Sequence, residues 1–154
     1  MNNRISMKKI CITLLIVISS ISCFSQEPEE HINIFFNIYQ SKNINMALDS
    51  LFSTNPWLME RSKDNIDNIK SQLTSYSNIL GKYQGFELIT SKKIGSCLQQ
   101  YTYIVKFDRQ PLRFNFIFYR AFDIWRLQNF RYDDNLSEEL YESSKIYYLE
   151  DKSF

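Results

Sequence analysis

The feature that most constrains the fold is a change of hydrophobic period at Gly81. Before this residue, apolar side chains recur every three or four positions, which is the spacing of one face of an α-helix. After it, apolar and polar side chains alternate, which is the spacing of strands with one buried face. The 154 residues include only 3 Gly and 3 Pro, so the chain is neither collagen-like nor a flexible linker. The sequence therefore predicts a single domain in which helices precede a sheet.

Three helices are expected before Gly81. A polar lead-in, residues 26–30, precedes the first helix, and the second helix begins near Ile44. The third begins at Asn55-Pro56, because asparagine caps helices and proline suits the first helical position, and it ends at Gly81. Each helix carries one apolar stripe. The stripes are Ile32, Phe35, Phe36 and Tyr39; Ile44, Ala47, Leu48 and Leu51; and Ile66, Ile69, Leu73, Tyr76 and Leu80.

Four strands are expected after Gly81, with turns too short for parallel crossovers. They are predicted at residues 86–92, 97–107, 112–120 and 124–132. Short connections join antiparallel neighbours, so the fold class is α+β with a curved four-stranded meander. The third helix is the expected cover of this sheet.

The register follows if each turn has two or four residues. The expected facing pairs are then Leu88 with Tyr101, Phe86 with Tyr103, Tyr103 with Phe116, Val105 with Phe114, Tyr101 with Phe118, and Phe118 with Leu127. With these pairings, the large apolar side chains lie on one face of the sheet, which we call the aromatic face. A slip of one residue would divide them between the two faces. The members of the aromatic face are Phe86, Leu88, Tyr101, Tyr103, Val105, Phe107, Leu112, Phe114, Phe116, Phe118, Trp125 and Leu127.

Residues 1–25 have the order of a secretory signal peptide: basic residues, then an apolar block, then small residues. The apolar block, residues 10–18, is too short to span a bilayer, and the alternative is a buried N-terminal helix. The start is Met1 or Met7. Cleavage after Ser25 and lipidation at Cys23, in a lipobox-like Ser-Ile-Ser-Cys, are two open outcomes. We expect an exported protein that is periplasmic or secreted, or that is anchored to the membrane by a lipid if Cys23 is the modified residue.

The expected division is a signal at residues 1–25, an α+β domain at 26–135 and a C-terminal helix or tail at 136–154. Without the signal, 15 basic and 17 acidic residues remain, a weakly acidic balance that argues against nucleic-acid binding. Cys97 is then the one cysteine left, so an internal disulfide is excluded. We interpret Cys97 as a small buried residue at the start of a strand rather than a nucleophile.

Three stretches carry a resemblance to a known family: residues 80–87, 114–119 and 125–130, within about residues 57–135. They resemble the cystatin-like cone of the NTF2-like superfamily, including a group of small exported bacterial proteins of unknown function. The resemblance implies a concave sheet around a long helix, often with a pocket at its open end, and frequent dimerisation through the outer sheet face. The chain departs from the best-known relatives in that all its helices precede the sheet.

Catalytic chemistry is sparse in this sequence. His31 and Cys97 lie far apart, so no cluster with metal-ligand spacing is present and no cofactor is expected. We interpret His31 as a half-exposed surface histidine rather than a general base. Enzymes of the resembling superfamily often place an aspartate or a His–Asp pair with a tyrosine in the cone, whereas the aromatic face here carries no carboxylate. We therefore expect no catalytic residues, without excluding an enzyme.

Two surfaces remain as candidates for binding. Tyr101, Tyr103, Asn129 and Arg131 are expected to line a pocket for a small apolar ligand, since aromatic walls with a few polar groups form such pockets. The competing interpretation is that the tyrosines belong to the core and their hydroxyls reach its rim.

The opposite face is the second candidate surface. Ile104, Ile117, Tyr119 and Phe130 form an apolar patch there, rimmed by Lys106, Arg113 and Arg126. Such a patch suggests a homodimer or an envelope protein partner. We therefore expect an exported, non-catalytic ligand-binding or protein-interaction module. The alternative is a small NTF2-like lyase or isomerase that uses Tyr101 or Tyr103 with Arg131.

Overall fold

The computed structural model describes residues 26–150, and the side chains of residues 26–145. The predicted signal peptide, with Cys23 and the cleavage position after Ser25, lies outside the described residues. The described elements, in chain order, are helices α2 (Pro28–Ser41), α3 (Ile44–Phe52), α4 (Pro56–Arg61) and α5 (Lys63–Leu80), strands β1 (Tyr83–Ile94), β2 (Leu98–Phe107), β3 (Leu112–Tyr119) and β4 (Arg126–Asp133), and helix α6 (Leu136–Glu150).

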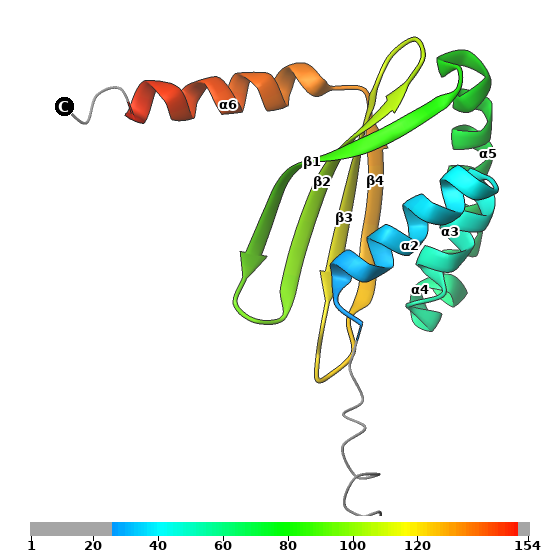
Figure 1. Ribbon diagram of the computed structural model, residues 1–154. Helices are drawn as coiled ribbons and strands as arrows, with labels where there is room; N and C mark the ends of the chain where they lie inside the picture. Colours follow the sequence, from blue (N-terminus) through cyan, green and yellow to red (C-terminus); the bar gives the residue numbers. More distant parts are fainter. Residues whose placement is uncertain (1–25, 151–154) are drawn as a thin grey trace, which may run out of the picture.

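The sheet is an antiparallel meander in which β1, β2, β3 and β4 lie side by side in sequence order. The helices α2 to α5 all lie on one side of it, and we call that side the inner face and the other the outer face (Figure 1). The α+β class with a four-stranded meander is confirmed. Within residues 26–150, no helix is long and apolar enough to cross a membrane.

The predicted third helix is two helices, because the chain leaves helical geometry at Ser62, with φ −126° and ψ 25°. Helix α5 ends at Gly81 as expected, and φ there is +88°, a conformation that glycine adopts without strain. A Cβ on Gly81 would come within 2.9 Å of the Asp108 Cβ. Because Asp108 lies this close, its Oδ2 accepts a 2.8 Å hydrogen bond from the Lys82 amide, next to Gly81. Glycine is therefore required both for the turn and for the approach of Asp108.

The strand pairing keeps the predicted faces while shifting the partners. Tyr101 pairs with Phe116 and Tyr103 with Phe114, two residues away from the expected partners, and Phe118 pairs with Leu127 as expected. The last pair before the turn between β2 and β3 is Val105–Leu112, so six residues lie between the two paired residues instead of the expected four. Because both numbers are even, every ring stays on the same face.

A β-bulge in β4 overturns three of the predicted placements. Ile117 pairs with Asn129 but Phe118 pairs with Leu127, so Gln128 is the extra residue. Beyond a bulge of one residue, the faces of a strand are exchanged. Phe130 therefore pairs with Phe116 on the inner face, and its expected position on the outer face is wrong.

The same bulge moves Asn129 and Arg131 to the outer face. Asn129 pairs there with Ile117, and Arg131 pairs with Asn115. Their expected position on the aromatic face is therefore wrong.

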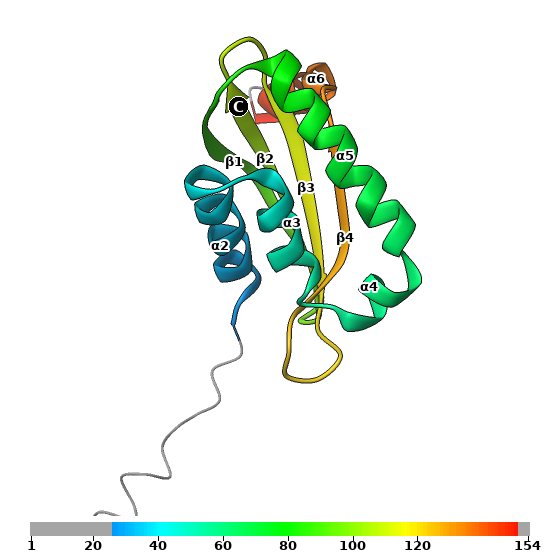
Figure 2. The ribbon, with the colours of Figure 1, turned by 90° about the vertical axis from the view of Figure 1, so that its right-hand side faces the viewer.

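The inner face is covered mainly by α2 and α3, and α5 covers its β3–β4 side (Figure 2). Phe36 of α2 stacks on Phe86 with a centroid distance of 3.8 Å and meets Tyr103 edge-on at 5.4 Å. Phe35 meets Phe116 at 5.5 Å. The expectation that the third helix is the cover is thus only partly right, because the two shorter helices contribute most of the buried side chains.

We expect Phe36→Ala to lower the free energy of unfolding by about 3–5 kcal/mol, because it removes a ring from the centre of the packed core. Urea unfolding followed by circular dichroism measures this change. Ile79→Ala is the matched control, since Ile79 is 61% exposed on α5 and its truncation should cost less than about 0.5 kcal/mol. Equal effects of the two substitutions would contradict the assignment of Phe36 to the core.

Candidate functional site

The four residues of the predicted ligand pocket do not come together. Tyr101 and Tyr103 are buried on the inner face, and the Tyr103 ring packs edge-on against Phe36 of α2 and Phe116 of β3. Asn129 and Arg131 lie on the outer face, on the other side of the sheet. The residues proposed for the lyase or isomerase alternative, a tyrosine with Arg131, are separated in the same way.

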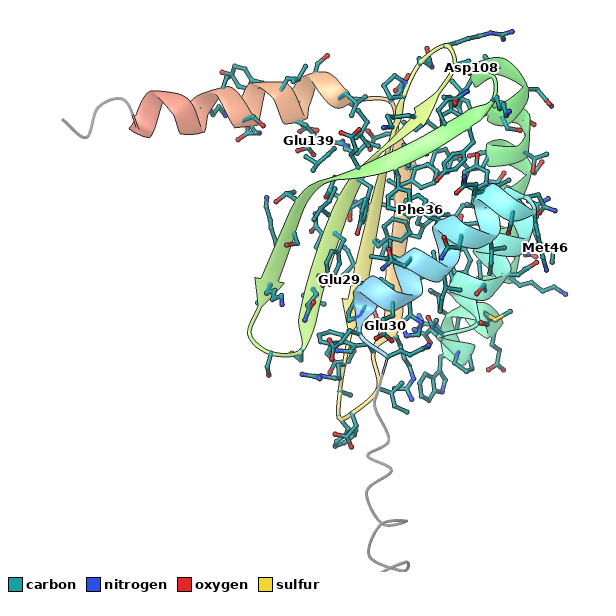
Figure 3. All side chains as sticks on the ribbon, viewed as in Figure 1. Glu29, Glu30, Phe36, Met46, Asp108 and Glu139 are labelled. Atoms are coloured by element: carbon teal, nitrogen blue, oxygen red, sulfur yellow. The ribbon has the colours of Figure 1, made fainter. Side chains whose placement is uncertain are left out.

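Tyr101 instead lies near a carboxylate that the sequence did not single out. Its hydroxyl donates a 2.6 Å hydrogen bond to Gln99 Oε1. Burial raises the pKa of the Tyr101 hydroxyl above its usual range, and the charge of Glu29, in the first turn of α2, adds to the shift. Figure 3 shows Glu29 at the start of α2, on the side of the sheet. Tyr101 therefore stays protonated near neutral pH and acts there as a hydrogen-bond donor.

The histidine and the cysteine occupy separate places. His31 is half-buried on α2, and its ring stacks on Phe118 with a centroid distance of 5.9 Å, which fits its interpretation as a half-exposed histidine. Cys97 is exposed in the turn between β1 and β2, so its expected buried position is wrong. Among residues 26–150, no three His, Cys, Asp or Glu side chains converge as a metal site would require.

The outer face contains three of the four predicted interface residues. Ile104 and Ile117 are half-buried there, and Tyr119 is exposed, whereas Phe130 belongs to the core. The face is basic, with five cations against two carboxylates. The cations are Lys92, Lys106, Arg113, Arg126 and Arg131, and the carboxylates are Glu87 and Asp133. Lys106 pairs with Glu87 at 2.6 Å.

Arg113 joins this face to α6. Its guanidinium binds Asp133 with two parallel hydrogen bonds of 2.9 and 3.0 Å, and it also binds Glu139 at 2.8 Å and Glu138 at 3.3 Å. The Asp133 hydrogen bond, followed by those of the glutamates, raises the pKa of Arg113 further above its usual range. A single, largely buried guanidinium therefore fixes the first turn of α6 to β3 and β4.

Beyond this anchor, α6 leaves the sheet and extends away from the outer face (Figure 1). Leu140 is 72% exposed and Tyr141 is 64% exposed. From Leu140 to Lys145, the hydrogen bonds and ion pairs of the described side chains are all within the helix. A hollow of about 650 Å³ lies in the corner between α6 and the outer face, and Lys92, Arg113 and Arg131 are among its lining residues.

Comparison with known proteins adds no family to this picture. No family model, curated protein or solved structure matches the chain. The structure shows helices packed on one face of a four-stranded antiparallel sheet.

We expect Arg113→Gln to release the first turns of α6, because three carboxylates would lose their shared cation and repel one another. Hydrogen exchange read by mass spectrometry should show the amides of residues 138–142 exchanging about tenfold faster or more. Lys106→Gln is the control, since it breaks an exposed ion pair on the same face without touching α6. Unchanged protection in Arg113→Gln would show that the anchor does not hold the helix.

His31 should make the protein less stable in mild acid. Burial lowers the pKa of His31 below its ordinary value of 6.5, with Glu30 acting in the opposite direction, so the folded state binds a proton less readily than the unfolded state. The neutral His31 side chain therefore costs the folded state nothing above pH 6.5, and the folded state loses stability as the pH falls below this value. Urea unfolding at pH 7 and pH 5 should show a larger loss for the wild type than for His31→Gln. Parallel losses in the two proteins would contradict the sign of the shift.

Proposed function

We propose that this protein is an exported, non-catalytic interaction module of the NTF2-like cone type that works as a homodimer. In the dimer, α6 of each copy packs across the outer face of the other. The single observation that carries this proposal is the exposed course of α6 beside a basic sheet face, of which the described helices cover only the part under the first turn of α6. The signal-like order of residues 1–25 supports export.

The filled inner face supports a surface function rather than chemistry inside the cone. The rings of Phe35 and Phe36 occupy the space over β2 and β3, where a cone-type enzyme would hold its substrate. Tyr101 and Tyr103 are part of that packing. Accessible groups of the described residues lie instead on the outside of the sheet, on α6 and beside α4.

Charge complementarity favours a second copy as the occupant of the outer face. Residues 136–150 contain four glutamates and one lysine, a net charge of −3, but Glu138 and Glu139 already bind Arg113 of the same chain and Glu142 pairs with Lys145. The outer face is basic, and within the described residues Lys92 and Arg131 form no ion pair there. Opposite charges on two surfaces of one chain steer two copies together and fix their relative orientation.

The dimensions and the apolar groups of the two surfaces also match. A helix of 15 residues is about 22 Å long, and four strands are about 14 Å apart from first to last, so one helix crosses the whole sheet. Leu140 and Tyr141 would meet Ile104 and Ile117. Arg113 directs α6 away from its own sheet. If each copy places its α6 on the outer face of the other, both outer faces are covered, as in a two-fold dimer.

The test is the mass of the protein in solution. Light scattering coupled to gel filtration should give twice the chain mass for the wild type and the single chain mass for the double variant Leu140→Ser, Tyr141→Ser. Both side chains are exposed, so the variant should keep the wild-type circular dichroism spectrum. Ile79→Ser, at an equally exposed position on α5, is the matched control and should remain dimeric.

Two further results bear on the same proposal. Raising the salt concentration should weaken the dimer, because part of its attraction is between exposed charges. A wild-type protein that stays monomeric throughout a dilution series would overturn the proposal. A dimer that persists in the Leu140→Ser, Tyr141→Ser variant would show that α6 does not form the interface.

A further inference from the structure

A cleft at the α4 end of the sheet has the composition of a ligand site, and it includes Tyr119 and Arg126 from the margin of the outer face. It lies between α4 and the loop that joins β3 to β4, and its volume is about 540 Å³. This volume is within the range of pockets for small organic molecules. Its lining includes Trp57, Arg61, Tyr119, Phe122, Arg126 and Gln128.

Three aromatic rings around this cleft are left open to solvent. Trp57 is 62% exposed, Phe122 is 89% exposed, and Tyr119 is also exposed. Single exposed apolar residues are common on protein surfaces, but several large rings around one hollow are typical of a binding site.

The charge of the cleft is positive. Arg61 and Arg126 both line it, and none of its described lining residues is acidic. Within the described part of the chain neither arginine forms an ion pair, although Glu60 and Asp123 are close in sequence. The Arg126 guanidinium lies over the Trp57 ring, 5.0 Å from its centroid. A guanidinium in this position over a ring still has N–H groups available for an anion.

The two walls of the cleft are fastened to each other. Asn55 accepts a hydrogen bond from the Leu58 amide at the start of α4, and its Nδ2 donates to the Leu127 carbonyl at 2.7 Å. The Leu127 amide in turn donates to Thr54 Oγ1 at 3.1 Å. Leu127 stands between Arg126 and Gln128, so these bonds set the distance between α4 and the arginine-bearing strand. A cleft held in this way loses little entropy when a ligand binds.

The β4 bulge also faces this cleft. Gln128, the extra residue of the bulge, is exposed and lines the hollow. Bulges frequently re-aim a side chain beside a functional site, and here the bulge adds an amide to a cleft that two arginines also line. The loop between β3 and β4, across the cleft from α4, is anchored by the buried side chain of Trp125. The Arg120 guanidinium carbon lies over this ring, 4.6 Å from its centroid.

We propose that this cleft binds a small organic anion with an aromatic body and a carboxylate group. The rings of Trp57, Tyr119 and Phe122 would flank the body, and Arg61 and Arg126 would bind the carboxylate. The volume of the cleft favours a small molecule over a protein segment. The inference does not depend on the proposed dimer.

Isothermal titration calorimetry with 2-naphthoate tests the inference, and its neutral counterpart 2-naphthylmethanol is the control ligand. We expect saturable binding of 2-naphthoate, and binding of the alcohol weaker by about 10- to 100-fold, since a hydrogen bond to a charged group contributes that much. Arg126→Gln and Arg61→Gln should each weaken 2-naphthoate binding at least tenfold. Lys42→Gln, which removes an equal charge outside the cleft, should leave binding unchanged.

Phe122→Ala separates the role of the rings from that of the charges. Phe122 is the most exposed of the three rings, so its removal should not affect folding, and 2-naphthoate should bind about 3- to 10-fold more weakly. Absence of saturable binding would overturn the inference. Equal affinity for the acid and the alcohol, or wild-type affinity in both arginine variants, would also overturn it.

Discussion

The rest of the structure depends on the burial of one aromatic face. The rings of β2, β3 and β4 form a continuous apolar layer, and Phe35 and Phe36 of α2 fill the space above it. Figure 3 shows Phe36 between its helix and the sheet. Because the layer is closed by the protein's own side chains, the polar and charged groups that could recognise another molecule are left on the outer face, on α6 and in the cleft beside α4.

The same division explains what the sequence could predict. The change of period at Gly81 and the alternation in the strands follow from burial on one face, so the class of fold and the membership of most of the aromatic face were accessible. Turn lengths of either four or six residues preserve that face, which is why the expected partners could shift while the side of the sheet did not.

The incorrect placements in β4 come from one residue that carries no signal of its own. Gln128 is neither glycine nor proline, and the trace that the bulge leaves in the sequence is a change of parity in the apolar positions, from Trp125 and Leu127 to Phe130 and Tyr132. The anchoring of α6 by Arg113 and the assembly of Trp57 with Arg126 join elements about 25 and 70 positions apart. A local pattern could not reveal either of them, since each depends on how the strand ends meet the helices.

The even spacing between β2 and β3 has a consequence for how this chain can change over evolution. Val105 closes on Leu112, and any loop of the same parity between them leaves the rings of β3 directed at the helices. An insertion or deletion of one residue would turn Phe114, Phe116 and Phe118 toward water together. Length variation at this turn should therefore be tolerated in steps of two, and odd changes should survive only where a new bulge restores the original side.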